Sequence, residues 1–196
     1  MARISRNNCI VFQPGAFIII SLALLMIPAR WVVGWFVAVF VHELCHYIAL
    51  CICKVPVLQI RIGAFGTAIQ TGEMTTRREI VAALAGPLGS LILLFFFQII
   101  PYVSLCALWQ LLFNMIPIYP MEGGRAVTGI CVYILGKEKG FFISKIISLL
   151  FVILFCAASL LISLRYKLGI MPVLIAALIV FRTIKIPCKE RQLIVQ

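Results

Sequence analysis

The chain has 196 residues, of which 64% are hydrophobic and only 12% are charged. A soluble domain is closer to half apolar and a quarter charged, so this composition excludes an ordinary soluble fold and favours an all-α polytopic membrane protein. The net charge of +11 could indicate a nucleic-acid partner. However, the basic residues lie mostly in short loops and tails, so we expect contact with anionic membrane lipid and no nucleic acid.

Six apolar segments are long enough, or nearly long enough, to be transmembrane helices. We expect these spans at residues 10–29, 31–52, 79–100, 103–135, 140–164 and 168–184, in one membrane-embedded domain that covers residues 1–196. The first segment could also be a signal peptide, but no convincing cleavage site follows it and the next span begins almost at once. We therefore interpret it as an uncleaved transmembrane helix.

Basic residues in loops and tails concentrate on one side of this six-span arrangement. With the N-terminus in the cytoplasm, only Arg30, Arg165 and Lys167 of these residues would face the other side. This bias predicts that both termini are cytoplasmic and that the protein is a multi-pass protein of the cell membrane. Residues 42–46 would then lie in the cytoplasmic half of the second span.

The segment between the second and third spans has a different pattern. In "VLQIRI", residues 57–62, apolar and polar side chains alternate, which is typical of a strand, and Gly63 and Gly66 allow a turn. We predict a short cytoplasm-side β-hairpin, whose open edge could pair with another extended chain. An ordinary connecting loop fits the pattern equally well.

The second span contains the stretch "HELCH", which holds the only two histidines of the chain, His42 and His46. Residues four apart share a helix face, so both imidazoles could bind one zinc ion. Glu43 could then take a proton from water that zinc activates. Ionisable groups within a membrane are costly and indicate a functional site more often than packing.

A catalytic zinc ion usually takes three protein ligands. The chain has six acidic residues and no aspartate, and apart from Glu43 only Glu122 lies deep in an apolar segment. Its surroundings, "NMIPIYPMEGGR" at 114–125, contain two prolines and two glycines that should break the helix. Glu122 is therefore our candidate third ligand, and an ion pair with Arg125 is the alternative.

The third span begins after a possible helix cap at Thr75 or Thr76 and contains the stretch "AGPLGS" at residues 85–90. Glu79 follows Thr76 at the spacing of a capping box. Small residues let membrane helices approach one another closely, so helix packing is our interpretation of Gly86 and Gly89.

The stretches "HELCH", "AGPLGS" and "NMIPIYPMEGGR" resemble, in order and spacing over about residues 30–135, the signatures of the site-2 protease family of intramembrane zinc metalloproteases. The likeness is greatest to the stage IV sporulation protein FB branch. It implies a zinc-dependent endopeptidase that hydrolyses transmembrane or membrane-proximal segments of membrane-anchored proteins in a bacterial membrane. His42 and His46 would bind one zinc ion per chain, with Glu43 as the general base.

The resemblance extends to two residues of the third stretch. Glu122 stands where the family has an aspartate ligand, and its longer side chain should affect activity more than metal binding, because catalysis tolerates less misplacement. Asn114 matches a family asparagine whose amide could hold the substrate backbone or the developing oxyanion. A hydrogen bond from Asn114 to another helix is an equal alternative.

Some relatives carry a PDZ or a CBS domain, and we expect neither here, because the segments between and after the expected spans are short, so we infer a minimal core. We expect its regulation to come from other membrane proteins or from substrate supply, and the core could form homo-oligomers. Two other functions are alternatives. One is a catalytically inactive relative that binds membrane segments as a scaffold. The other is a metal or proton transporter, but the sequence has no chain of acids or histidines that would cross the bilayer as such a function needs.

Overall fold

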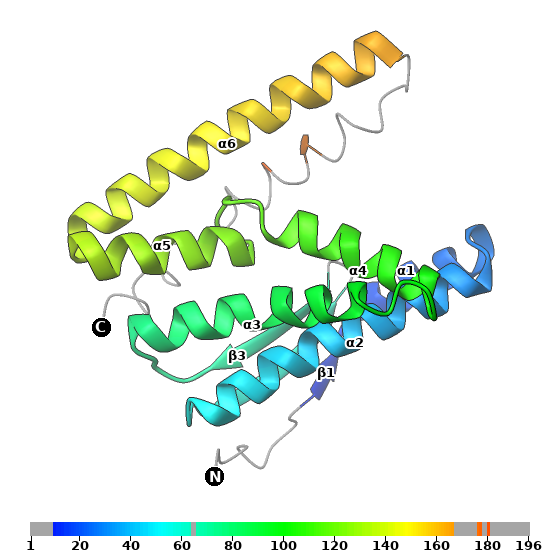
Figure 1. Ribbon diagram of the computed structural model, residues 1–196, viewed down its shortest axis with the longest axis horizontal. Helices are drawn as coiled ribbons and strands as arrows, with labels where there is room; N and C mark the ends of the chain where they lie inside the picture. Colours follow the sequence, from blue (N-terminus) through cyan, green and yellow to red (C-terminus); the bar gives the residue numbers. More distant parts are fainter. Residues whose placement is uncertain (1–9, 64–65, 167–175, 178–179, 181–196) are drawn as a thin grey trace. The chain divides into compact units, whose positions relative to one another are not determined.

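The computed structural model describes residues 10–63, 66–166, 176–177 and 180 of the chain (Figure 1). The sixth expected span, residues 168–184, therefore lies almost wholly outside the described residues. In chain order the elements are β1 (Ile10–Phe12), α1 (Pro14–Met26), α2 (Ala29–Ile52), β2 (Val57–Gly63), β3 (Gly66–Thr71), α3 (Thr76–Leu94), α4 (Pro101–Asn114), α5 (Glu122–Leu135) and α6 (Lys137–Tyr166). They fall into two compact units, Met1–Phe113 and Asn114–Gln196.

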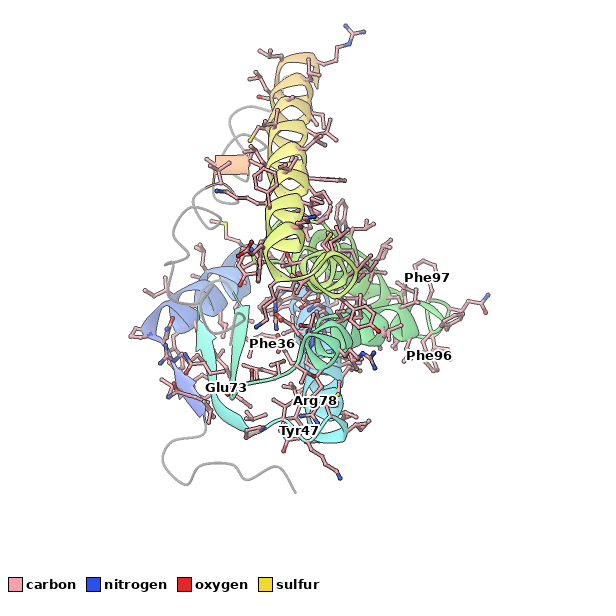
Figure 2. The ribbon with its side chains drawn as sticks, turned by 90° about the vertical axis from the view of Figure 1, so that its left-hand side faces the viewer. Phe36, Tyr47, Glu73, Arg78, Phe96 and Phe97 are labelled. Carbon is pink, nitrogen blue, oxygen red and sulfur yellow. The ribbon has the colours of Figure 1, made fainter. Side chains whose placement is uncertain are left out.

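Two of these helices, α2 and α6, are long and apolar enough to cross a membrane, and α1 is a shorter apolar helix. Their large side chains are widely exposed: Leu161 and Leu164 of α6 are 67% and 70% exposed. In the turn between α3 and α4, Phe96 and Phe97 project outward (Figure 2). Such an apolar exterior is unusual for a protein surrounded by water. The number of membrane crossings stays a prediction.

The β-hairpin between α2 and α3 is confirmed, because β2 and β3 pair antiparallel with Gly63 opposite Gly66 at the turn. The sheet also has a third strand, β1, which the sequence pattern did not indicate. Residues 10–12 pair in parallel with β2, with Ile10 opposite Ile60, so our placement of these residues in the first span is wrong. Their side chains, Ile-Val-Phe, favour a strand, and Pro14 suits the first turn of the helix that follows.

The third strand changes which edge of the hairpin is open. The strand order is β1-β2-β3, so β2 is the central strand. Within the described part of the chain, β3 therefore carries an outer edge that pairs with no other strand. The sheet packs on the end of α2 and the start of α3 through Leu50, Val55, Val57 and Ala82.

Helix α3 begins after Thr75, as expected, but without the predicted capping box. The Thr75 side chain makes no capping hydrogen bond. Glu79 lies four residues after this cap, one position beyond the capping-box position, so that prediction is wrong. Helices α2, α3 and α4 then meet around Leu93 of α3, which packs with the small side chains of Ala38 and Ala107.

The expected fourth span is interrupted, as its prolines predict. Helix α4 ends at Asn114, α5 begins at Glu122, and Pro117 and Pro120 lie between them. The two glycines lie in the first turn of α5 and not in the break. A Cβ added to Gly123 would lie 2.5 Å from the carbonyl carbon of Met115, so glycine lets the folded-back connection approach the helix.

Within the second unit, hydroxyl groups join α5 to α6. Thr128 Oγ1 donates to the carbonyl oxygen of Gly124 at 2.7 Å and lies 2.6 Å from Ser144 Oγ. Gly140 of α6 also packs directly on α5, because an added Cβ would lie 2.5 Å from the Val132 backbone.

Candidate metal centre

Helix α2 carries both histidines on the side that packs against α3. The ring centroids of His42 and His46 are 4.9 Å apart, as their spacing of four residues predicts. His42 is only 1% exposed, and His46 is partly buried. The first unit by itself therefore brings the two imidazoles together.

Each imidazole has a hydrogen-bonding partner on α3. His46 Nδ1 lies 2.7 Å from the carbonyl oxygen of Ala82. A carbonyl oxygen only accepts hydrogen bonds, so the neutral form of His46 carries its proton on Nδ1 and has its lone pair on Nε2. His42 Nδ1 lies 2.8 Å from Ser90 Oγ, a group that can donate or accept. Partners of this kind orient histidine rings in metal sites.

Gly86 lies between these two partners and faces the ring nitrogens. A Cβ added to Gly86 would lie 2.6 Å from His42 Nε2 and closer still to His46 Nε2. Both Nε2 atoms therefore converge over one position of α3, and the missing side chain leaves that space open. Our interpretation of Gly86 as a packing glycine is incomplete, whereas Gly89 does pack, with an added Cβ 2.5 Å from Cys45 Sγ.

The sequence pattern alone assigns no role to Ser90 or Ala82. Ala82, Gly86 and Ser90 recur every four residues, so they share one face of α3. That spacing was the available signal, but it shows only that the three share a face and not what the face contacts.

Glu43 lies on an adjacent face of α2, which looks toward the hairpin. It is partly buried. It helps to line a cleft of about 150 Å³, together with Phe40, Leu44 and Tyr47 of α2 and Ile60, Thr67 and Ile69 of the hairpin. Tyr47 of this wall is labelled in Figure 2. The candidate general base therefore lies in an otherwise mainly apolar cleft between α2 and the hairpin.

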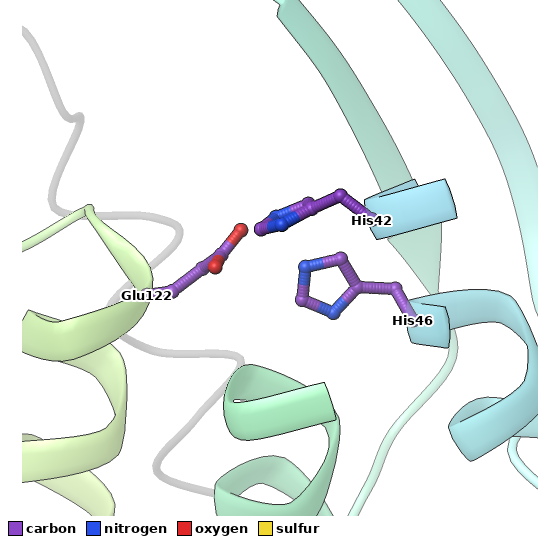
Figure 3. A group of neighbouring side chains, drawn as sticks. All are labelled: His42, His46 and Glu122. Atoms are coloured by element: carbon purple, nitrogen blue, oxygen red, sulfur yellow. The ribbon is translucent and has the colours of Figure 1, made fainter. Parts of the chain in front are cut away.

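Glu122 and Asn114 belong to the second unit. Glu122 is the first residue of α5, and Asn114 Nδ2 donates a long hydrogen bond, 3.5 Å, to Glu122 Oε1. The connection between them is anchored by Ile118, which is fully buried. The break thus brings the two candidate residues of this unit together. Figure 3 shows the side chain of Glu122 with those of His42 and His46.

Among known proteins, this chain is similar to solved structures. No family model matches the chain, and no curated protein matches it. Among solved structures, the site-2 protease from Methanocaldococcus jannaschii matches with a TM-score of 0.59 and 24% identity, over 91% of each chain. The chain has the fold of a site-2 protease. The resemblance to the stage IV sporulation branch stays a prediction.

The residues on this fold suit a zinc ion. Neutral imidazole nitrogen and carboxylate oxygen are the donors of a two-histidine, one-glutamate catalytic zinc site. The proton on His46 Nδ1 leaves Nε2 as the metal-binding atom, and the bare Gly86 leaves room beside it. The chain's own contacts therefore favour Nε2 coordination by at least one histidine.

Proposed function

We propose that this protein is a membrane-embedded zinc metalloprotease that cleaves membrane-anchored protein substrates. The observation that carries the proposal is the convergence of His42 Nε2 and His46 Nε2 over Gly86. Both histidines lie on a helix that is long and apolar enough to cross a membrane. Such a helix has no structural need for two imidazoles and an adjacent carboxylate, since each is costly in an apolar setting.

One zinc ion would be held by His42, His46 and Glu122. The support is that the two imidazoles converge within the first unit and that Glu122 supplies a partly buried carboxylate at the start of α5, which together make the donor set of such a site. Glutamate replaces the aspartate expected from the family resemblance, but both offer the oxygen donor that zinc accepts. Asn114, which donates to Glu122, would help to orient the carboxylate and to hold the substrate backbone.

When bound, zinc supplies Lewis acidity, which polarises a carbonyl group and lowers the pKa of water. Glu43 would accept a proton from the water that attacks the scissile carbonyl carbon. The same carboxyl group would then deliver the proton to the leaving amine nitrogen, so that water and one peptide bond yield a carboxylate and an amine. The position of Glu43 in the cleft between α2 and the hairpin suggests that the scissile segment binds there.

The proposed substrate is a transmembrane or membrane-proximal segment that binds in extended form. A helical segment hides its peptide groups in its own hydrogen bonds, so it would have to unwind first. The outer edge of β3 would offer hydrogen bonds to the unwound backbone. We place the protein in the cell membrane with several spans and cytoplasmic termini, and we expect regulation by partner membrane proteins.

The test combines metal content with cleavage. Detergent-purified wild type should hold about one zinc ion per chain, and His46→Ala should lose it. Glu43→Gln should keep zinc but cleave a fluorogenic transmembrane peptide in liposomes about 10²–10⁴ times more slowly than wild type. Zinc without cleavage of any member of a peptide panel would favour the inactive scaffold. Wild type that binds no supplied zinc would overturn the proposal.

A further inference from the structure

The two imidazoles are held by partners of different kinds. His46 Nδ1 bonds to the backbone carbonyl of Ala82, which is present whatever side chain stands at that position. His42 Nδ1 instead lies 2.8 Å from the hydroxyl of Ser90, a group that one substitution removes. The hydrogen bond at His42 Nδ1 therefore depends on a side chain, whereas the hydrogen bond at His46 Nδ1 depends on the backbone.

Both members of the His42–Ser90 pair are shielded from solvent. His42 is 1% exposed and Ser90 is 0% exposed, so bulk water does not reach the contact. For His42 to present an unprotonated Nε2, its proton must be on Nδ1 and must be donated to Ser90 Oγ. Without the hydroxyl, that N–H would lose this buried acceptor, and the competing tautomer with the proton on Nε2 would become more populated.

We infer that Ser90 is a positioning residue that holds His42 in the tautomer and orientation needed for metal binding. The inference rests on the proposed zinc site. It adds that zinc affinity is set partly from α3, by a residue that does not touch the metal. Partners of this type typically contribute about 10–100-fold to metal affinity.

Ser104 provides a matched control. It is also a serine with 0% exposure in the first unit, and its Oγ donates to the carbonyl oxygen of Leu93 at 2.7 Å. Replacing it with alanine removes a buried hydroxyl and one hydrogen bond, as Ser90→Ala does. It leaves the contact between His42 and Ser90 intact.

The experiment measures the zinc dissociation constant of the detergent-solubilised full chain by competition with a chromogenic chelator. Ser90→Ala should bind zinc about 10–100 times more weakly than wild type, and Ser104→Ala should stay within about threefold of wild type. The Co²⁺ absorption spectrum provides a second readout, because it reports ligand geometry directly. It should change in Ser90→Ala and stay the same in Ser104→Ala.

A second pair of variants separates the hydroxyl from side-chain volume. Ser90→Thr and Ser90→Val have nearly the same shape, but only threonine keeps an Oγ. If the inference holds, the threonine variant binds zinc about 10–100 times more tightly than the valine variant, even if both fold less well than wild type. Equal affinities in both comparisons, with zinc bound by wild type, would overturn the inference and leave the proposed function standing. Absence of zinc from wild type would overturn both.

Discussion

His46 Nδ1 lies 2.7 Å from the carbonyl oxygen of Ala82 on the neighbouring helix, so the neutral imidazole of His46 presents its unprotonated Nε2 away from that contact. The metal-binding atom of His46 is thus selected before any metal arrives. This relationship lies wholly within the first unit, as does the convergence of the two Nε2 atoms over Gly86.

Gly86→Ala should abolish or strongly weaken zinc binding. The new methyl group would lie 2.6 Å from His42 Nε2 and even nearer to His46 Nε2, where a metal ion would have to bind. We expect zinc affinity to fall by at least about 100-fold, which is the upper end of the range for substitutions of residues that contact the ligands. The measurement is chelator competition, with Gly89→Ala as control, because its methyl group would meet Cys45 instead of the imidazoles. Wild-type affinity in Gly86→Ala would contradict the proposed coordination by Nε2.

Glu122→Ala should lose zinc, whereas Glu122→Asp should retain it, because aspartate keeps the carboxylate oxygens that a third ligand needs. The measurement is zinc content per chain after dialysis against metal-free buffer. Glu138→Ala serves as control, since Glu138 is an exposed acidic residue in the first turn of α6. If Glu122→Ala holds zinc as tightly as wild type, the third ligand lies elsewhere and pairing of Glu122 with Arg125 becomes the better interpretation.

Asn114→Ala should slow cleavage more than it weakens zinc binding. Loss of one donor to a developing oxyanion costs about 10²–10³ in kcat. The hydrogen bond from Asn114 to Glu122 is long, 3.5 Å, so its loss should change zinc affinity by about tenfold at most. Cleavage kinetics and chelator competition on the same preparation compare the two effects. If zinc affinity and cleavage rate fell by the same factor, the role of Asn114 would be only to hold Glu122.

Thr128→Val should destabilise the second unit by about 1–3 kcal/mol, because it removes a buried hydroxyl from its two hydrogen-bonding partners. Those partners are the Gly124 carbonyl oxygen and Ser144 Oγ, at 2.7 and 2.6 Å. Hydrogen exchange of the α5 amides in detergent would report the change as faster opening. Thr128→Ser keeps the hydroxyl and should stay close to wild type, and equal exchange in both variants would count against the hydroxyl link.

The local features of this chain could be predicted because short-range rules govern them. The helical period placed His42 and His46 on one face, alternation in residues 57–62 predicted the hairpin, and Pro117 and Pro120 predicted the break before Glu122. The predicted capping box at α3 failed because the cap is Thr75, which puts Glu79 one position too far along the helix. An error of one residue at a helix start is enough to change the side-chain contacts there.

The sequence by itself determined an apolar helical chain, a hairpin, a broken fourth helix and two histidines at metal-binding spacing, because each depends on neighbours within a few residues. Only the tertiary structure decided that Ser90 and Ala82 hold the imidazoles, that Gly86 leaves space beside them, and that Ile10 pairs with Ile60. These contacts join residues from 36 to 50 positions apart in the sequence. They depend on how α2 packs against α3 and how β1 aligns with β2, and helical period or strand alternation carries no information about such packing.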